Sequence, residues 1–558
     1  MIDEGIVQRL RLREDQIFLA LTIIIAIIAG LSAVLFTLAI QGVKDALFGI
    51  SPSHVRLILA PTLVSLVTGV LLAKFFPEAR GSGVPQTEAA FHLNQGEIRP
   101  VVPFGKFLTG VLCVGSGHSM GREGPSVQIG AGLASAIGQW FGLSPSRVQS
   151  LVPVGAAAAL AAAFNTPVAA VLFALEEIIG DMNAGLIGST VVASVTSVVV
   201  ERAILGDEVL FRVPAYQLVH PAELLAYALL GVVGGLISLL FCKGLLQLRR
   251  VFLKLPVSTT IFQPAMGGLV IGIVLVFVPQ VMGVGYEYVD QALNGGMLMR
   301  TMLLLCAVKL AATIISYSSG NAGGIFAPSL YLGAMAGGAV GMLVHQFAPF
   351  PTAAPGAYAL VGMGTLFAGI IRAPMTSVFM IFELTQDYQI LVPLMIANML
   401  SFAISRRFQP KPVYHALLEQ NHIYLPTAEN RLAAWKAQNI MSRDVVLIPE
   451  DMTVNEVWKS IPGSKANTFL IGHSDHLAGT VSREDMERAI EAGHGSHSIG
   501  SLAAGQFDYL HPDQPLELAL ERFGTTSDVL PVVSRAGRRV EGVITLDTIL
   551  QFIQKKQA

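Results

Sequence analysis

The sequence predicts a polytopic α-helical membrane protein with an inverted-topology internal repeat and broken helices, followed by a cytoplasmic α/β module. Three observations support this fold class. Hydrophobic residues form 53% of the 558 residues and charged residues only 13%, against about 25% charged in soluble domains. Apolar runs recur from residue 17 to residue 408, and motifs within them repeat at a nearly constant displacement. The composition becomes polar after residue 414.

The apolar runs are of two kinds. Those at 17–40, 224–241 and 378–404 are long enough to cross about 30 Å of hydrocarbon. Those at 107–117 and 331–344 are rich in Gly and end at Pro or polar residues. We expect these two to form half-crossing or tilted helices buried within the protein. No signal-peptide cleavage site follows the first run, which predicts that it is retained as a helix.

Basic residues flank the apolar region at both ends. They are Arg9, Arg11 and Arg13 before the first run, and Arg406, Arg407 and Lys411 after the last. Because Lys and Arg concentrate in cytoplasmic loops, we expect both termini on the cytoplasmic side. The net charge of −2 says little about partners, and no nucleic-acid partner is expected.

Two sets of matching residues indicate the internal repeat. GREGPSVQIG at 121–130 and GIFAPSLYLG at 324–333 share Gly, Pro, Ser and Gly at positions 203 residues apart. The second set, 207 residues apart, matches Val154, Gly155, Pro167, Val171 and Glu176 to Val361, Gly362, Pro374, Val378 and Glu383. We therefore expect repeat halves at about 17–205 and 224–414, with a site at their interface. Chance similarity among Gly- and Pro-rich helices is the alternative.

The polar part of the chain is duplicated as well. We divide the chain into a membrane domain at 1–414, a linker at 415–436 and two copies at 437–492 and 498–555. Three positions match at a displacement of 63, namely Pro449, Gly479 and Ser482 with Pro512, Gly542 and Thr545. Each copy predicts a strand, a polar turn, a second strand and a helix. The pair resembles tandem CBS domains, cytoplasmic modules that often bind adenine nucleotides.

Glycine and proline predict helix starts inside the membrane region. In GREGP (121–125) the proline suits the first turn of a helix, and the glycines let the backbone bend into it. GGIFAP (323–328) and GSGVP (81–85) predict two more such starts. A helix N-terminus exposes unpaired N–H groups and a partial positive charge. Several of them together would bind an anion without a full cation, and therefore release it readily.

These three motifs, with Tyr414 in KPVYHALL, resemble the four anion-pathway motifs of the CLC family of chloride channels and proton/chloride exchangers. The resemblance spans essentially the whole chain. It implies a chloride transporter rather than an enzyme, in the inner membrane of a bacterium, as a homodimer with one anion path per subunit. The residues that it implies for anion binding are Ser82, Gly83, Arg122, Glu123, Gly124, Ile325, Phe326 and Tyr414. Hydroxyls of Ser82 and Tyr414 and amides of Ile325 and Phe326 would form the central site.

Glu123 carries the charge of the substrate at an anion-binding helix start. Its ionised side chain can occupy an anion site in place of chloride, and protonation would free that site and carry a proton part of the way across the membrane. We therefore expect Glu123 to act as both gate and proton carrier. The alternative is a capping carboxylate that pairs with Arg122. Lys106 and Arg122 would attract anions or pair with nearby carboxylates.

Glu177 distinguishes an exchanger from a channel. It resembles the internal proton-relay glutamate of CLC exchangers, a position that is commonly apolar in CLC channels. We therefore expect proton-coupled antiport, with a passive voltage- or pH-gated chloride channel as the alternative. Glu176 recurs as Glu383 in the repeat, which leaves Glu177 specific to one copy. In another interpretation Glu176 and Glu177 simply face cytoplasmic water. Glu88 matches a family acidic position, but we interpret it as a structural residue at a helix start.

An adenine nucleotide at the CBS pair is the one cofactor that the resemblance suggests, and no metal site is expected. Ser482, Asp485 and Thr545 would reach it, although the second copy has Thr548 where the aspartate would be.

Two rival functions are weaker. A magnesium transporter would need converging carboxylates, and an intramembrane hydrolase would need more than the adjacent His118 and Ser119. The cysteines at 113, 242 and 306 lie in apolar runs and are interpreted as core residues.

Overall fold

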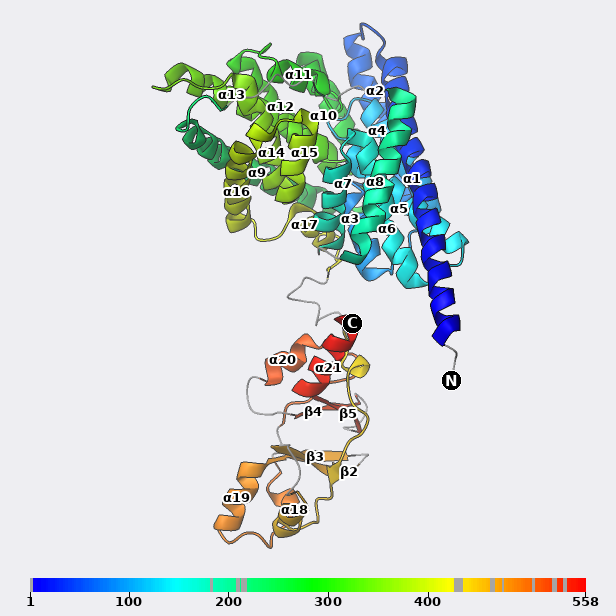
Figure 1. Ribbon diagram of the computed structural model, residues 1–558, viewed down its shortest axis with the longest axis vertical. Helices are drawn as coiled ribbons and strands as arrows, with labels where there is room; N and C mark the ends of the chain where they lie inside the picture. The colour runs from blue at the N-terminus through cyan, green and yellow to red at the C-terminus, as the bar shows by residue number, and fades with distance from the viewer. Residues whose placement is uncertain are drawn as a thin grey trace. The chain divides into compact units, whose positions relative to one another are not determined.

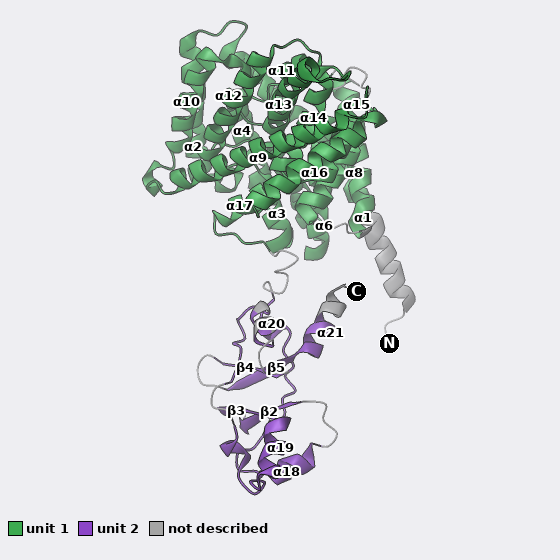
Figure 2. Ribbon diagram, turned by 90° about the vertical axis from the view of Figure 1, so that its left-hand side faces the viewer, with its two compact units in different colours: residues 1–425 green, residues 426–558 purple. Residues whose placement is uncertain are grey.

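The computed structural model describes residues 4–557 with several gaps. Outside this description are residues 181–183, 207–210, 212–217, 426–434, 462–466, 474–475, 504–506, 524–528 and 535–538. The side chains of a few further residues, among them Arg9, Arg11 and Arg13, are outside it too, as is part of the predicted linker at 415–436. The chain divides into two compact units, 1–425 and 426–558 (Figure 2).

Unit 1 is helical, and its two halves contain the same order of elements. The described helices of the first half are α1 (Glu4–Phe48), α2 (His54–Lys74), α3 (Val84–Leu93), α4 (Val101–Gly115), α5 (Glu123–Trp140), α6 (Pro145–Phe164), α7 (Pro167–Phe173) and α8 (Ala184–Leu205). Those of the second half are α9 (Glu223–Leu253), α10 (Gln263–Phe277), α11 (Tyr286–Leu293), α12 (Met299–Ser318), α13 (Phe326–Phe347), α14 (Pro355–Ile370), α15 (Pro374–Thr385) and α16 (Leu391–Phe408). A final helix, α17 (Val413–Glu419), follows.

Equivalent helices of the two halves make equivalent contacts. α5 packs on α6 as α13 packs on α14, and α1 packs on α8 as α9 packs on α16 (Figure 1). Gly130 and Gly155 permit the first contact and Gly333 and Gly362 the second, since a Cβ on any of them would meet backbone within 2.3 Å. Eight described helices are long and apolar enough to span a membrane. Of these, α6 and α13 are the most buried, so they form the centre of unit 1.

Reciprocal contacts relate the halves by an approximate two-fold axis. The N–H of Gly121 donates to the carbonyl of Gly324 and the N–H of Gly324 donates back, both at 2.8 Å. Glu176 accepts from the N–H groups of residues 375 and 376 at the start of α15, and Glu383 accepts from those of 168 and 169 at the start of α7. Each half therefore caps a helix of the other, as in an isologous interface.

One expectation about the apolar runs is wrong, and another is met only in part. The run at 378–404 is two helices, because the chain breaks after α15 at Gln386, whose φ of 54° is left-handed, and resumes at α16. The run at 331–344 is buried as expected, but it lies within the 22-residue helix α13 and so is not a half-crossing helix. The run at 107–117 does form most of a short helix, the 15-residue α4.

The membrane unit extends past the predicted boundary at residue 414. That boundary falls inside α17, where Ala416, Leu417 and Leu418 are buried, and unit 1 ends only at residue 425. The composition becomes polar only after α17, whose residues 416–418 are still apolar and pack in unit 1. The three cysteines are all buried, as expected for core residues.

Unit 2 contains two copies of one small α/β motif. Its described elements are β1 (Leu447–Ile448), α18 (Val454–Ser460), β2 (Thr468–His473), β3 (His476–Ser482), α19 (Arg483–Glu491), α20 (Glu517–Phe523), β4 (Val529–Val533), β5 (Val540–Thr545) and α21 (Leu546–Gln557). β2 pairs antiparallel with β3, and β4 with β5, while β1 joins β2 in parallel. The displacement of 63 continues into the cores, where Val481 and Met486 correspond to Ile544 and Ile549, all buried.

Candidate anion pathway

The starts of α3, α5 and α13 meet at the centre of unit 1, as their motifs predict. A Cβ on Gly124 would lie 2.5 Å from the hydroxyl oxygen of Ser82 and 3.2 Å from Cα of Gly324. A Cβ on Gly83, whose φ is +106°, would lie 2.7 Å from the carbonyl oxygen of Gly124. The three loops thus pack backbone against backbone, which glycine permits. Three helix starts at one place favour an anion.

Two hydroxyl groups at this centre have no protein partner. The hydroxyls of Ser82 and Tyr414 are fully buried, and neither forms a hydrogen bond with any residue that the structure describes. The two hydroxyls lie near each other, close enough for at most a weak mutual contact. A buried hydroxyl without a partner costs free energy. The pair therefore fits a ligand that accepts from both donors, as an anion does.

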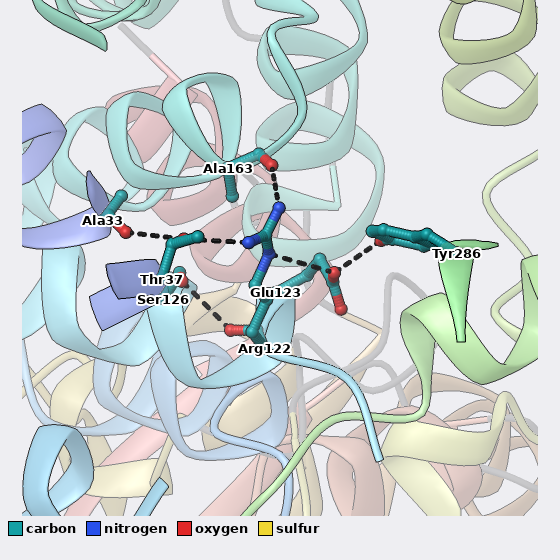
Figure 3. A network of polar contacts seen from close by, with 7 residues as sticks. All are labelled: Ala33, Thr37, Arg122, Glu123, Ser126, Ala163 and Tyr286. Carbon is teal, nitrogen blue, oxygen red and sulfur yellow. Dashed lines mark hydrogen bonds and ion pairs between the residues drawn. The ribbon is translucent and has the colours of Figure 1, made fainter. Parts of the chain in front are cut away.

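Glu123 is the first residue of α5 and is fully buried (Figure 3). Its Oε1 accepts a hydrogen bond of 2.7 Å from the hydroxyl of Tyr286. Its Oε2 lies over Gly121, where a Cβ would be 2.3 Å from Oε2 and 3.2 Å from the amide nitrogen of Ala327. The carboxylate therefore lies beside the start of α13, in the region where these helix starts favour an anion.

Arg122 is not the close partner of Glu123 that the capping alternative required. Its Nε is 3.9 Å from the carboxylate, while the ends of its guanidinium group donate to the hydroxyl of Thr37 and the carbonyl of Ala163 (Figure 3). Arg122 is thus a nearby positive charge with its own anchors. A cavity of about 350 Å³ lies beside it.

Ile325 and Phe326 form the cap and first turn of α13, and both are buried. The ring of Phe326 contacts three other phenylalanine rings, with centroid distances of 5.0 Å to Phe164, 5.7 Å to Phe173 and 4.4 Å to Phe367. This aromatic cluster is the apolar wall beside the helix starts. Backbone amides and hydroxyls are then the main polar groups of the central site.

Glu177 lies in a π-helical turn at 174–179 that continues α7. It is buried, and its Oε1 has no hydrogen-bond partner among the described residues. Glu176, by contrast, is fully used in capping α15. The interpretation in which both glutamates face water is therefore wrong. Tyr414 lies within electrostatic range of both Glu177 and Glu123.

Glu88 does not act at a helix start. It lies inside α3, is buried, and pairs with His415 of α17, whose side chain is partly exposed. Glu88 is also within electrostatic range of Glu177. The Glu88–His415 pair therefore joins a carboxylate within electrostatic range of Glu177 to a partly exposed imidazole.

Two buried lysines hold the glycine loops at equivalent places. The ammonium group of Lys106 donates to the carbonyls of Ala79 and Gly81, and that of Lys309 to those of Val281 and Gly283. The lysines are 203 residues apart. Lys106 therefore binds backbone, not the carboxylate that we considered as a partner.

A cavity of about 390 Å³ opens next to Gly81. Arg80 and Arg249 line it, together with Tyr317 and Asn421. Both guanidinium groups donate hydrogen bonds to neutral amide and carbonyl oxygens. The cavity therefore carries positive charge beside Gly81, which precedes the start of α3.

The rival functions find little support in the described residues. His118 bonds to Ser65 and Ser316, whereas Ser119 bonds to Thr313, so the two side chains point to different partners. They cannot act as a catalytic pair. No group of three or more His, Cys, Asp or Glu side chains in the described parts of the chain is arranged to hold a metal ion.

The predicted nucleotide residues of unit 2 are used in helix capping. The hydroxyl of Ser482 accepts from the amide of Asp485 at the start of α19 and donates to its carboxylate. At the start of α21 the amide of Thr548 likewise donates to the hydroxyl of Thr545, while the amide of Thr545 donates to the hydroxyl of Thr548. Thr548 thus replaces the aspartate as a capping residue.

Sequence reasoning missed Tyr286, the side chain that binds Glu123. Tyr286 begins α11 after Gly283 and Gly285, which correspond to Gly81 and Gly83 at a displacement of 202. That Gly-x-Gly pattern was the available signal. It has no proline after it, and so it did not match the other helix starts.

Comparisons with known proteins agree with this geometry. Residues 64–406 match the family model described as voltage gated chloride channel, and 437–492 and 500–555 match the CBS domain. An H(+)/Cl(-) exchange transporter ClcA of Vibrio campbellii is 32% identical over 414 residues, which cover 71% of this chain and 88% of that protein.

Two solved structures show similar folds. The crystal structure of a slow cyanobacterial Cl-/H+ antiporter has a TM-score of 0.67 and 27% identity, over 72% of this chain and 97% of that one. A eukaryotic CLC transporter has a TM-score of 0.65 and 20% identity, over 95% and 97%, and shows the fold alone. These are transport proteins, not enzymes. With its broken helices, its repeat and two CBS domains, this integral membrane chain belongs to the voltage gated chloride channel family, the CLC family.

Proposed function

We propose that the protein exchanges chloride for protons across a membrane. The observation that supports this best is the position of Glu123, a fully buried carboxylate beside the start of α13. Relatives described as Cl-/H+ exchange transporters and antiporters support the same function. In this proposal chloride is bound by the unpartnered hydroxyls of Ser82 and Tyr414 and by the first amides of α13.

In this proposal the carboxylate of Glu123 is the gate, and it competes with chloride for the position beside the start of α13. When ionised, Glu123 repels an incoming anion and occupies the position next to the helix start, which also attracts its own charge. When protonated, the side chain loses that attraction and leaves the place to chloride. One residue thereby alternates between anion exclusion and proton transport.

Glu177 supplies protons from the other side in this proposal. It is buried with one unpartnered oxygen, and it shares the electrostatic neighbourhood of Tyr414 with Glu123. The Glu88–His415 pair joins a carboxylate within electrostatic range of it to a partly exposed imidazole and offers a stepping point for protons. Because Glu177 makes no contact with the helix starts in this scheme, its loss should leave the anion site intact.

Proteoliposomes with an imposed chloride gradient and a pH electrode test the exchange. Wild-type protein should drive protons uphill, and Glu123→Gln should retain chloride flux while losing proton movement, because the amide neither titrates nor competes as a charge. The passive channel is the second candidate, since the matching family model is described as a chloride channel. Chloride flux without uphill proton movement in the wild type would favour it.

The assembly and orientation are also proposals. We propose a homodimer with one anion path per subunit, in a bacterial inner membrane with both termini cytoplasmic. Crosslinking and sizing in detergent would contradict the dimer if a fully active monomer were found. Labelling of single cysteines introduced near residue 10 from one side of the membrane would test the orientation.

We further propose that the CBS pair senses an adenine nucleotide. Although the amide of Asp485 donates to the hydroxyl of Ser482, the side chain of Asp485 stays partly exposed near the start of α19. Asp485→Ala in the full chain should weaken binding of ATP, measured by calorimetry. Absence of binding at millimolar ATP to the wild type would leave unit 2 a structural role.

A further inference from the structure

Tyr286 holds Glu123 from the opposite half of the membrane unit. It is the first residue of α11, directly after Gly285, whose φ of +80° turns the chain into the helix. Its hydroxyl donates to Oε1 of Glu123 at 2.7 Å (Figure 3). α11 of the second half corresponds to α3 of the first, whose start carries the hydroxyl of Ser82. The repeat therefore places one hydroxyl at the start of each of these two equivalent helices.

The other charged and titratable groups around Glu123 are anchored elsewhere. Arg122 of α5 donates to Thr37 and Ala163, and Lys309 of α12 donates to two backbone carbonyls. Tyr414 of α17 lies within electrostatic range only. Among the described side chains, Tyr286 is the one that donates a hydrogen bond to this carboxylate.

The ring of Tyr286 is fixed independently of Glu123. It packs edge-on against Phe211 with a centroid distance of 5.1 Å and against Phe164 at 6.5 Å. The guanidinium of Arg122 lies over the ring, 5.9 Å from its centroid. A ring held in this way keeps its hydroxyl in place when the carboxylate moves away. That hydroxyl is then a buried donor without a partner, which is unfavourable unless an anion replaces the carboxylate.

We propose that Tyr286 has two roles at one position: it latches the ionised side chain of Glu123, and it binds the anion that takes the place of Glu123. The proposal rests on the proposed exchange, because it assumes that Glu123 leaves the path. Ser82 and Tyr414 would bind the anion at the inner end, and Tyr286 at the outer end, each with a neutral donor that permits release.

The two roles predict opposite effects of the same substitution. With Glu123 present, Tyr286→Phe removes a bond that stabilises the closed, ionised gate. Chloride turnover at neutral pH should therefore rise about tenfold, the effect of one hydrogen bond to a charged group. Because the lost bond favoured the ionised carboxylate, the pH profile of flux should also move toward higher pH. With Glu123→Ala, Tyr286 binds only the anion, and Tyr286→Phe should weaken anion binding about tenfold.

The experiment is a double-mutant comparison in purified full-length protein. Chloride flux is measured in proteoliposomes and chloride binding by calorimetry, for Tyr286→Phe in the wild-type and in the Glu123→Ala background. Tyr288→Phe, two residues along α11, is the matched control and should change neither quantity. Tyr286→Leu also lacks the donor and replaces the phenylalanine variant if that variant is unstable.

Faster flux in the first background with weaker binding in the second supports the proposal. Effects in the same direction in both backgrounds, as a purely structural role would give, overturn it, as does an effect in one background only. The proposed exchange fails separately, because it depends on uphill proton movement by the wild type. The Tyr286→Phe experiment measures only chloride flux and chloride binding, so its outcome does not depend on proton movement.

Discussion

Four carboxylates of the membrane unit form two contrasting pairs: Glu176 and Glu383 are half-buried, whereas Glu123 and Glu177 are buried. Glu176 and Glu383 occupy equivalent places in the two halves, and both oxygens of each accept hydrogen bonds from a helix start of the other half. Glu123 and Glu177 each occur in one half only, and each has a buried oxygen without a hydrogen-bond partner in the described structure. The duplicated pair is saturated with hydrogen bonds, whereas the unduplicated pair is the one to which we assign proton transfer in the proposed exchange.

The same distinction applies to the other polar groups of the unit. Lys106 and Lys309 are duplicated, and their ammonium groups are satisfied by backbone carbonyls. Ser82 and Tyr414 supply the unpartnered hydroxyls, and the second half has Val284 where the first has Ser82. Polar groups that occur in both halves are thus satisfied within the protein, whereas the unpartnered groups to which we assign transport roles occur in one half only.

The largest test of this distinction compares two adjacent glutamates. Glu177→Gln should abolish proton movement in proteoliposomes while chloride flux stays, because a buried relay that cannot titrate hands on no protons. Glu176→Gln is the matched control and should keep the wild-type ratio of protons to chloride. Loss of coupling in the control, or its retention in Glu177→Gln, would contradict the division of roles.

The second test compares the duplicated carboxylates with each other. Glu176→Gln and Glu383→Gln should each lower the free energy of unfolding by about 1.5–3 kcal/mol, because each removes a charged acceptor from a helix start. Denaturation in detergent measures both. The loss for Glu176 should be the larger, since it also accepts from the hydroxyl of Thr376. A strong effect in one half and none in the other would break the proposed equivalence.

The third test concerns the glycines that let equivalent helices touch. Gly130→Ala and Gly333→Ala should each destabilise by about 1–3 kcal/mol, because the new methyl group would lie 2.2 Å from a carbonyl oxygen. Gly188→Ala in α8 meets nothing within 4 Å and serves as the control. Its stability should be unchanged or higher, since alanine favours a helix. Equal behaviour of all three variants would argue against tight packing at the repeat contacts.

The smallest effects are expected in unit 2. Ser482→Ala and Thr545→Ala remove equivalent helix caps and should each cost about 1 kcal/mol in the full chain. Urea titration followed by tryptophan fluorescence reports the change. If added ATP stabilised the wild type and the Thr545 variant but not the Ser482 variant, the first copy would carry a ligand role beyond capping.

Much of the pathway could be predicted from residue patterns. A proline after glycines specifies a helix start locally, so α3, α5 and α13 were placed correctly before any packing was known. The start of α11 was missed because it has glycines before it but no proline in its first turn. The break within 378–404 was missed because hydropathy does not record a left-handed residue such as Gln386. Neither Glu88–His415 nor Tyr286–Glu123 could be predicted, since both contacts join segments more than 160 residues apart.

The paired hydrogen bonds between Gly121 and Gly324 have a mechanical consequence. They tie the loops before α5 and α13 together by backbone alone, and the N–H of Gly323 ties in the loop before α3 through Gly81. The two halves therefore cannot rock apart about this axis without breaking bonds in the middle of the membrane, where no water replaces them. A side chain such as that of Glu123 can rotate without breaking any of these backbone bonds. In the proposed exchange, these backbone bonds would hold the helix starts in place while the side chain of Glu123 moves.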